Sequence, residues 1–423
     1  MRLIKSTLIL AVLTSFLFFI LFFSGGLEGL GAFWKGLIQI QPQFSVAGSG
    51  LLLGSSLVLE VSLIWIALQS SRRETVSIVI ASVILLLGAS LVAGLYGLFF
   101  SPVPGICAVL VAFATLLIFE KTDAGAREPV LRRLFGNRLR ADVFRRLVDS
   151  GLRIDFPGEL LEASVLVCTV HNHVDLMETL SPSDYVALMN LYLRTASDFL
   201  VDVGGYLDEC SGESLRVIFG VPLPVDGTSN HASKAARASL DLVSRLEELN
   251  RACDSLWQKR LDFRIGLNSG GMIAAAYGGA RMGRYSVSGP VVEFAHHLSA
   301  ACAQYGCRIL SGPTTYELAS DKLEGRPIDL LQRAGSRRRV ELYEFLAAKN
   351  SLSPERERSR DHFWKGVIFF RERKWEEAIR AFSSARIPGI PDMVLDHYLE
   401  RVERARRGDD ERSPEQAVLT GAV

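Results

Sequence analysis

Two histidines and an aspartate stand close together after an apolar run near the middle of the chain. The segment His171-Asn172-His173-Val174-Asp175 follows the strand-like run Val165–Val170. Imidazole nitrogens and a carboxylate can bind zinc, so a zinc site is one interpretation. The pattern lacks a histidine after the aspartate, where Leu176 stands, and the remaining histidines form no second motif. We therefore favour a solvated loop that holds no metal.

A second ionisable group lies inside an apolar run. Glu60 is near the middle of residues 50–69. An ionisable residue in a segment of membrane-spanning length is a functional-site candidate by default. Glu60 either takes part in sensing or is protonated and hydrogen-bonds to a neighbouring helix near Ser90 or Tyr96. We favour the second interpretation.

The composition indicates a membrane region followed by a soluble one. The chain has 423 residues with a formal net charge of +1, from 47 basic and 46 acidic side chains. This balance gives no reason to expect a nucleic-acid partner. Hydrophobic residues make up 49% of the chain and are concentrated before residue 120. The six cysteines form no CxxC pair, which argues against a structural zinc site or a disulfide framework.

Four apolar runs, each near the length of a membrane span, lie at residues 7–23, 50–69, 76–100 and 103–119. Basic residues flank them on one side only: Arg2, Lys5, Arg72, Arg73, Lys121, Arg127, Arg132 and Arg133. The opposite loop, residues 24–49, carries only Lys35. The positive-inside rule then predicts a four-helix transmembrane region over residues 1–120, in the plasma membrane, with both termini cytoplasmic.

Residues 121–151 are basic and amphipathic. Apolar residues recur there every four positions, at Leu131, Phe135, Leu139, Val143 and Leu147. This spacing predicts a juxtamembrane signalling helix. Its apolar stripe could pair with a second copy or lie against the following domain, and its arginines also suit an anionic lipid surface. We favour the dimer contact.

Residues 152–347 alternate between strand and helix patterns. Strands are predicted at 165–170, 263–268, 272–277, 285–288, 308–310 and 340–346, with a hairpin over 204–219 and helices at 183–203, 231–257 and 290–305. Gly270-Gly271 and Gly278-Gly279 indicate turns around the strand 272–277. The whole pattern predicts an α+β layer fold.

The C-terminal part has a different pattern. Residues 356–408 contain Gly366, Phe369, Ala378, Phe382 and Ala385 at the spacing of one tetratricopeptide-like helical pair. One such pair cannot bury its own apolar face, so it should dock on the preceding domain or on a partner. Residues 409–423 are charged and small, which predicts disorder.

Residues 135–347 resemble a class III adenylate/guanylate cyclase domain of the membrane-anchored bacterial type. Four blocks, in the family's order and spacing, carry the resemblance: Leu134-Phe135-Gly136, then Val203–Asp208 with Val217–Pro224, then Arg264–Gly270, then Tyr285–Gly289. The resemblance implies a ferredoxin-like sheet with packed helices. It also implies a dimer whose two chains share each active site, with ATP or GTP as the substrate.

The family's metal-binding positions are altered here. Such a cyclase attacks the α-phosphate with the ribose 3′-hydroxyl, assisted by two Mg²⁺ or Mn²⁺ ions that two aspartates hold. The resemblance places those aspartates at Thr169 and Glu213. Glu213 keeps a carboxylate on a longer arm, whereas Thr169 offers only a neutral hydroxyl. We therefore expect no cofactor, with Mg²⁺ or Mn²⁺ required if the protein is active.

The base and transition-state positions are altered as well. The lysine and aspartate that read adenine correspond to Glu209 and Pro290. The asparagine that orients the ribose and the arginine that stabilises the transition state correspond to Glu293 and His297. Glu209 would repel a triphosphate, and Glu293 would pair with His297 one helical turn later.

These substitutions predict a pseudo-cyclase. We expect a membrane-anchored homodimer or heterodimer that regulates or scaffolds cyclic-nucleotide signalling, and possible ATP or GTP binding stays open. One alternative is an active cyclase in which Glu213, with His171 or Asp175, supplies non-standard ligands. Another is a membrane receptor or scaffold that binds no nucleotide.

Overall fold

A computed structural model describes residues 2–37, 45–46, 48–68, 70, 72–96, 98–120, 123–150, 152–153, 155–223, 230–279, 283–332, 339–408 and 417–418. The chain divides into two compact units, Met1–Val130 and Leu131–Val423. The segment predicted to be disordered, 409–423, lies outside the described residues except for the short strand β11 (Ala417–Val418). Of the three consecutive arginines at 337–339, the first two lie outside the described residues too.

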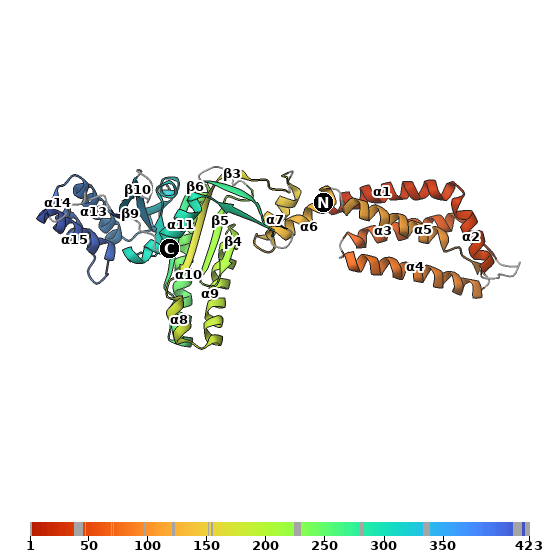
Figure 1. Ribbon diagram of the computed structural model, residues 1–423, viewed down its shortest axis with the longest axis horizontal. Coiled ribbons are helices and arrows are strands. Elements are labelled where there is room, and N and C mark those ends of the chain that lie inside the picture. The colour runs from red at the N-terminus through yellow and green to blue at the C-terminus, as the bar shows by residue number, and fades with distance from the viewer. Residues whose placement is uncertain are drawn as a thin grey trace. The chain divides into compact units, whose positions relative to one another are not determined.

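The N-terminal unit is a bundle of apolar helices. Its elements are α1 (Arg2–Phe23), α2 (Gly26–Leu37), β1 (Ser45–Val46), α3 (Ser49–Ala67), α4 (Arg72–Leu95), β2 (Leu98–Phe99) and α5 (Val103–Glu120). Figure 1 shows α1, α3, α4 and α5 alongside one another. Helices α3 and α5 contact each other, and both also contact α1 and α4. Many large apolar side chains face outward, among them Phe16, Leu51 and Leu85. An apolar exterior over an apolar core is typical of helices in lipid.

Two of these helices are long and apolar enough to cross a membrane, Ser49–Ala67 and Glu74–Leu95. A third span results if Leu8–Phe23 and Leu27–Gly36, which meet at a bend of 66°, are taken as one. Val103–Phe119 is apolar but shorter. The described residues thus contain two candidate spans, and the predicted total of four stays a prediction.

The predicted neighbours of Glu60 are wrong. The Ser90 hydroxyl donates to the carbonyl oxygen of Phe100 at 2.6 Å and accepts from Trp34 Nε1 at 3.0 Å. Tyr96 is exposed. Glu60 is instead buried near Thr14 of α1.

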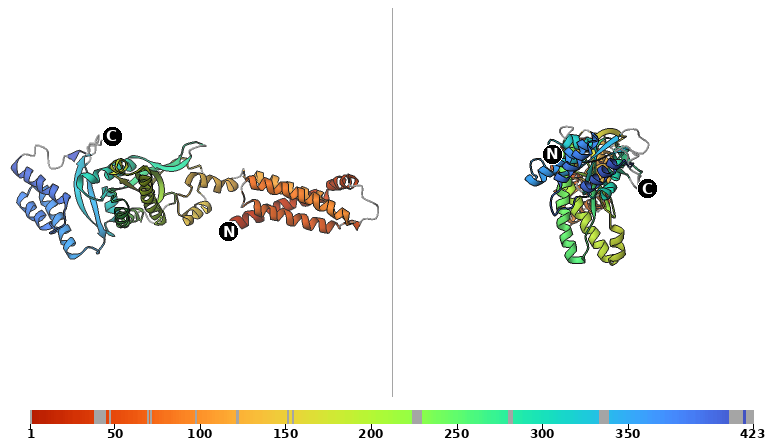
Figure 2. Two further views of the ribbon diagram at one scale, coloured as in Figure 1. Left: turned by 90° about the horizontal axis from the view of Figure 1, so that it is seen from below. Right: turned by 90° about the vertical axis from the view of Figure 1, so that its left-hand side faces the viewer.

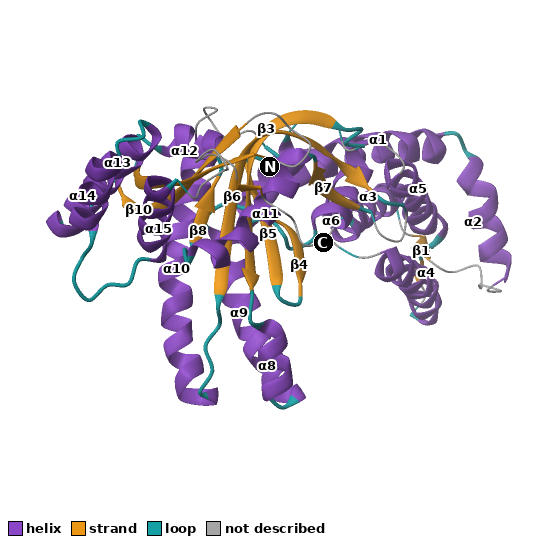
Figure 3. Ribbon diagram, turned by 60° about the vertical axis from the view of Figure 1, so that its left-hand side comes forward, coloured by secondary structure: helices purple, strands orange, loops and turns teal. Residues whose placement is uncertain are grey.

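The C-terminal unit is built on one mixed sheet. Its strands are β3 (Glu159–Val170), β4 (Tyr206–Ser211), β5 (Ser214–Phe219), β6 (Phe263–Tyr277), β7 (Arg284–Ser288), β8 (Ile309–Ser311), β9 (Leu323–Gln332) and β10 (Arg339–Ala348). Among the described residues the order is β11-β9-β10-β8-β6-β3-β5-β4, with β7 paired to β6. Strands β6 and β8 pair in parallel, as do β9 and β11, and the other pairs are antiparallel. Figure 3 shows β6, β3, β5 and β4 side by side. The α+β prediction is confirmed.

Helices cover both faces of this sheet. They are α8 (His173–Thr179), α9 (Pro182–Asp202), α10 (Asn230–Trp257), α11 (Pro290–Tyr305) and α12 (Pro313–Ala319). Alternate strand residues such as Leu166 and Ile265 pack with α9 and α10 in one core. Because side chains alternate along a strand, Gly266 points to the opposite face, where α11 lies.

Strand β6 is a single long strand, not two. The predicted turn at Gly270-Gly271 is wrong, because both residues pair with β3, opposite Ala163 and Glu162. Gly270 has φ of 151°, a conformation that glycine adopts without strain. The predicted turn at Gly278-Gly279 does follow the end of β6.

The predicted helix over 121–151 is broken in two. Helix α6 (Asp123–Phe135) ends before Gly136, which has φ of 53°, and α7 (Ala141–Asp149) follows. Leu131, Phe135 and Leu147 are fully buried. The Phe135 ring lies 4.8 Å from that of Tyr285 and 5.6 Å from that of Tyr206. The apolar stripe therefore packs within its own unit and is not free to pair with a second copy.

The C-terminal helices dock on the sheet, as one of the two predicted arrangements required. They are α13 (Pro354–Arg371), α14 (Trp375–Ala385) and α15 (Met393–Arg407), the last of which the pattern did not predict. Phe363, Phe382 and Tyr398 share one apolar core with Leu298 of α11 and Leu342 of β10. The left view of Figure 2 shows these helices, in blue, beside the strands that they cover.

Candidate functional site

The two predicted metal positions come together in space. Thr169 lies near the end of β3, and Glu213 lies in the turn between β4 and β5. The backbone N–H of Val170 donates to the carbonyl oxygen of Glu213 at 2.9 Å. The hydroxyl oxygens of Thr169 and Ser214 lie 3.2 Å apart. The hairpin thus places these two positions side by side.

The side chains at these positions do not fit two divalent cations. Mg²⁺ and Mn²⁺ prefer several carboxylate oxygens. Glu213 supplies one carboxylate, and the Thr169 hydroxyl is neutral and already bonded to Ser214. Within the described ranges, no group of three or more His, Cys, Asp or Glu side chains is placed to hold a metal ion.

A bulge in β4 brings two carboxylates onto one arginine. Leu207 pairs with Val217, but the register then shifts so that Glu209 pairs with Arg216. Arg216 Nε donates to Asp208 Oδ2 at 2.7 Å, and Arg216 Nη2 lies 2.8 Å from Glu209 Oε2. The Asp208 side chain is 0% exposed, and that of Glu209 is 39% exposed. The negative charge predicted to repel a triphosphate is therefore paired within the chain.

The same arginine reaches the helix that carries the other altered positions. Arg216 Nη1 donates to Nε2 of His296 on α11 at 3.2 Å. Pro290 is the first residue of that helix, whereas Glu293 and His297 point to the surface. Although both are described, no ion pair joins Glu293 to His297, so the predicted pairing is wrong. The histidine that contacts the hairpin is its neighbour, His296.

The His171–Asp175 segment, for which zinc binding was the less favoured interpretation, makes other contacts. His171 Nε2 donates to the carbonyl oxygen of Ser299 at 3.2 Å, and His173 Nδ1 donates to that of Val170 at 3.0 Å. Asp175 is exposed on α8. These two ring nitrogens therefore bind backbone carbonyl groups instead of a metal ion. The loop that we expected to be solvated is therefore held to the protein by these two bonds.

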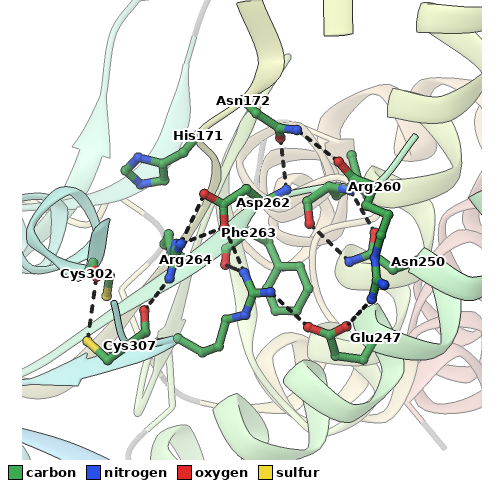
Figure 4. A network of polar contacts seen from close by, with 12 residues as sticks. His171, Asn172, Glu247, Asn250, Arg260, Asp262, Phe263, Arg264, Cys302 and Cys307 are labelled. Atoms are coloured by element: carbon green, nitrogen blue, oxygen red, sulfur yellow. Dashed lines mark hydrogen bonds and ion pairs between the residues drawn. The ribbon is translucent and has the colours of Figure 1, made fainter. Parts of the chain in front are cut away.

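A polar network ties this loop to the start of β6 (Figure 4). Asn172 accepts from the backbone N–H of Asp262 and donates to the carbonyl oxygen of Arg260, both at 2.9 Å. Asp262 lies 2.9 Å from Arg264 and 2.8 Å from Arg308. Arg264 also donates to the carbonyl oxygen of Cys307 at 2.7 Å. The side chains of Arg264 and Arg308 therefore bind groups of this chain around Asp262.

A buried chain of hydroxyl groups links the sheet to α10 and α12. Ser164 Oγ lies 2.8 Å from Nδ1 of His231 and 2.6 Å from Ser269 Oγ, which lies 2.8 Å from Thr315 Oγ1. All four side chains are buried. With no exposed member, the Ser–His contact is a structural element and offers no nucleophile to a substrate.

The histidines make the stability of this unit depend on pH. Burial lowers the pKa of His171, His231, His296 and His397 below the ordinary value. The unfolded chain takes up protons below about pH 6.5, whereas the folded unit resists protonation. The contribution of these histidines to the free energy of unfolding is therefore constant above that pH and decreases as the pH drops through it.

We expect the melting temperature of the full chain to fall between about pH 7 and pH 5.5. The variant His231→Gln should flatten this slope because its amide can still bond to Ser164. His297→Gln is the matched control because His297 is exposed on the same unit. A melting temperature that rises over this range would contradict the prediction.

Three comparisons relate this geometry to known proteins. Residues 159–330 match the family model described as the adenylate and guanylate cyclase catalytic domain. Adenylate cyclase 1 of Rhizobium meliloti (strain 1021) is 21% identical over 192 residues, which are 45% of this chain and 28% of that protein. The adenylate cyclase of Anabaena cylindrica is 23% identical over 150 residues, 35% of this chain and 28% of that protein. The chain thus matches less than a third of the length of these relatives.

A solved structure gives a similar match. The adenylyl cyclase CyaB from P. aeruginosa is 22% identical and aligns with a TM-score of 0.43, covering 46% of this chain and 99% of that one. The matched family region begins with β3 and ends in β9, so it contains Thr169, Glu209, Glu213 and α11.

Proposed function

Residues 159–330 form a class III adenylate/guanylate cyclase domain, and from that premise we propose that this chain is a pseudo-cyclase. It serves intracellular cyclic-nucleotide signalling as a regulatory or dimerisation module and does not itself make the nucleotide. The single observation that carries the proposal is the pairing of Thr169 with Ser214, which leaves one carboxylate where two metal ions need two.

The other half-site supports the same proposal. Arg216 pairs with Glu209, which occupies the base-reading position, and Pro290 has no side-chain hydrogen-bonding group. Losing one preorganised electrostatic group typically costs about 10²–10³ in rate. Both halves are altered in this chain. In a dimer with a complete partner chain, each shared site would therefore still lack one of its two sets of residues, either the metal-binding set or the base-reading set.

Membrane anchoring and dimerisation belong to the proposal. The two candidate spans and the apolar exterior of the N-terminal unit support an integral membrane protein. Four spans with both termini cytoplasmic remain the arrangement that we propose from the distribution of basic residues. An unpaired apolar surface supports the dimer: Leu160 of β3 and its register partner Ile273 of β6 are 76% and 49% exposed. Apolar pairs of this kind on a sheet face fit a second copy or a related cyclase chain.

A cyclase assay tests the proposal. Full-length protein in lipid nanodiscs, with Mg²⁺ or Mn²⁺ and either ATP or GTP, should form no cyclic nucleotide above a protein-free blank. Thr169→Asp should stay equally silent, because it restores one metal position and leaves Glu209, Pro290, Glu293 and His297 unchanged. Metal-dependent product from the natural chain would refute the proposal, and turnover by the variant alone would refute the assignment of positions.

If the assay detects no product, calorimetric titration with ATP or GTP distinguishes an inactive protein that binds nucleotide from one that does not. Saturable binding of ATP or GTP would identify a nucleotide-sensing regulator. Absence of binding would identify an interaction module or membrane scaffold. Cross-linking of the full chain, with Leu160→Glu as the variant, reports whether the exposed sheet surface holds two chains together.

A further inference from the structure

Glu60 is a fully buried acid without a counter-charge. It lies in α3 and is 0% exposed, within the bundle that α1, α3 and α5 form. Neither of its carboxyl oxygens has a hydrogen-bond partner among the described residues. The apolar stretches 8–23, 49–67, 75–95 and 103–119 contain no other Asp, Glu, Lys, Arg or His. An ionised carboxylate would therefore have no opposite charge inside this bundle.

The hydroxyl groups beside Glu60 have already used their hydrogens. Thr14 of α1 is the polar side chain beside the Glu60 carboxyl group, and no hydrogen bond joins the two in this geometry. Its hydroxyl donates to the carbonyl oxygen of Leu10 at 2.7 Å, with that of Ala11 at 3.1 Å. Ser56, one turn before Glu60 on the same buried side of α3, donates to the carbonyl oxygen of Leu52 at 2.7 Å. Both hydroxyl oxygens can therefore only accept a further hydrogen bond.

This donor count decides the protonation state. An ionised carboxylate only accepts hydrogen bonds, so it has nothing to accept from Thr14 or Ser56. A protonated carboxyl group carries one O–H and can donate it to the free lone pair of Thr14. Burying an ionised carboxylate with neither charge partner nor donor costs several kcal/mol or more. The packed bundle is consistent only with the acid form.

We propose that Glu60 is a proton-binding site inside the N-terminal helical bundle. The proton is bound while α1, α3 and α5 are packed as described, and it leaves only when the helices separate enough to hydrate the carboxylate. Proton occupancy and helix packing are thereby linked. The only other titratable group in the stretches that pack against Glu60 is the Cys107 thiol of α5, which is neutral in its ordinary form. The site takes a proton and no metal cation.

Infrared spectroscopy tests the site in the full chain. In lipid nanodiscs at about pH 7, exposed carboxyl groups are ionised, and a buried acid shows a carbonyl stretch above the amide I band. We expect this band in the natural protein and its complete loss in Glu60→Gln. Glu28→Gln, at an exposed position of α2, is the matched control and should keep the band. An unchanged spectrum in Glu60→Gln would overturn the proposal.

Two further measurements guard against a misfolded variant. Thr14→Val removes the acceptor but no charge, so it should keep the band and move it to higher frequency. Sodium titration of the natural protein should leave the band unchanged. Loss of the band on adding Na⁺ would identify an ionised cation site instead and would also overturn the proposal.

Release of the proton should change the thermal stability of the N-terminal bundle. Above about pH 4.5 an unfolded chain releases this proton whereas the packed bundle keeps it, so raising the pH from there should progressively lower the melting temperature of the bundle in the natural full chain. Glu60→Gln should show no such slope because its amide cannot ionise. A Glu60→Gln variant that loses stability in parallel with the natural protein would count against the site. These outcomes do not depend on the cyclase domain, so they stand apart from the cyclase assay.

Discussion

Replacing Gly266 with alanine is expected to prevent the 131–423 unit from reaching its folded state. A β-carbon at this position would lie 2.1 Å from the carbonyl oxygen of Ala295 and 2.4 Å from the backbone nitrogen of Ser299. Both atoms belong to the backbone of α11, so no side chain can move aside. We expect a loss of more than about 4 kcal/mol, which is a large part of the stability of an ordinary domain.

Denaturant unfolding of the full chain, followed by tryptophan fluorescence, measures this loss. Gly279→Ala is the matched control, because a β-carbon there meets no atom within 4 Å. It should unfold like the natural protein. A Gly266→Ala protein that is soluble and as stable as this control would show that α11 does not lie against β6 as described.

Replacing Arg216 with methionine should cost about 3–5 kcal/mol, the usual loss when one partner of a buried ion pair is removed. Asp208 is fully buried, and Arg216 is the only residue to which its side chain is hydrogen-bonded in the described structure. Methionine keeps much of the arginine's length but offers no donor. The variant therefore leaves a buried carboxylate without a partner.

A double-mutant cycle separates this effect from lost packing. Asp208→Leu combined with Arg216→Met removes both charges, so it should recover most of the stability that the single variant loses. Arg237→Met is the control, because the Arg237–Asp241 pair is exposed on both sides and should contribute less than about 1 kcal/mol. If the single and double variants unfold alike, the buried pair is not what stabilises the hairpin.

Helices whose apolar residues recur at a clear helical period were predictable from the sequence. The helices predicted at 183–203 and 290–305 are α9 and α11, within a residue at each end. Both carry a proline in the first turn, and Ser181 caps α9 through the backbone N–H of Asp184. In both helices the residues that favour a helix start and the spacing of the apolar residues indicate the same bounds. The predicted and observed bounds therefore agree closely.

Strand β9 was missed because its residues contradict the usual strand pattern. It contains Pro327, which cannot donate to a ladder and normally argues against a strand. The structure accommodates it at an irregularity, where the register between β9 and β10 shifts between Leu342 and Tyr343. Such a bulge depends on how the following strand β10 pairs with β9, so the residues of β9 alone could not reveal it.

The site was predictable only in part for the same reason. The order of the motif blocks placed Thr169 beside Glu213, because a strand end and a hairpin turn meet in this fold. It did not reveal the roles of Asp208, Arg216 and His296. The bulge in β4 rotates Asp208 toward Arg216, and the position of α11 decides that His296, not His297, faces the hairpin. Register and helix rotation are tertiary properties.

The apolar core shared by the C-terminal helices and the sheet has a consequence for biosynthesis. A ribosome makes Leu298 and Leu342 before Phe363, Phe382 and Tyr398, which cover them. A growing chain that ends before α13 exposes this apolar surface, the kind that chaperones and proteases recognise. Chains that stop before Val402 leave part of this core uncovered, and we expect them to be bound by chaperones or degraded more readily than chains that extend through it.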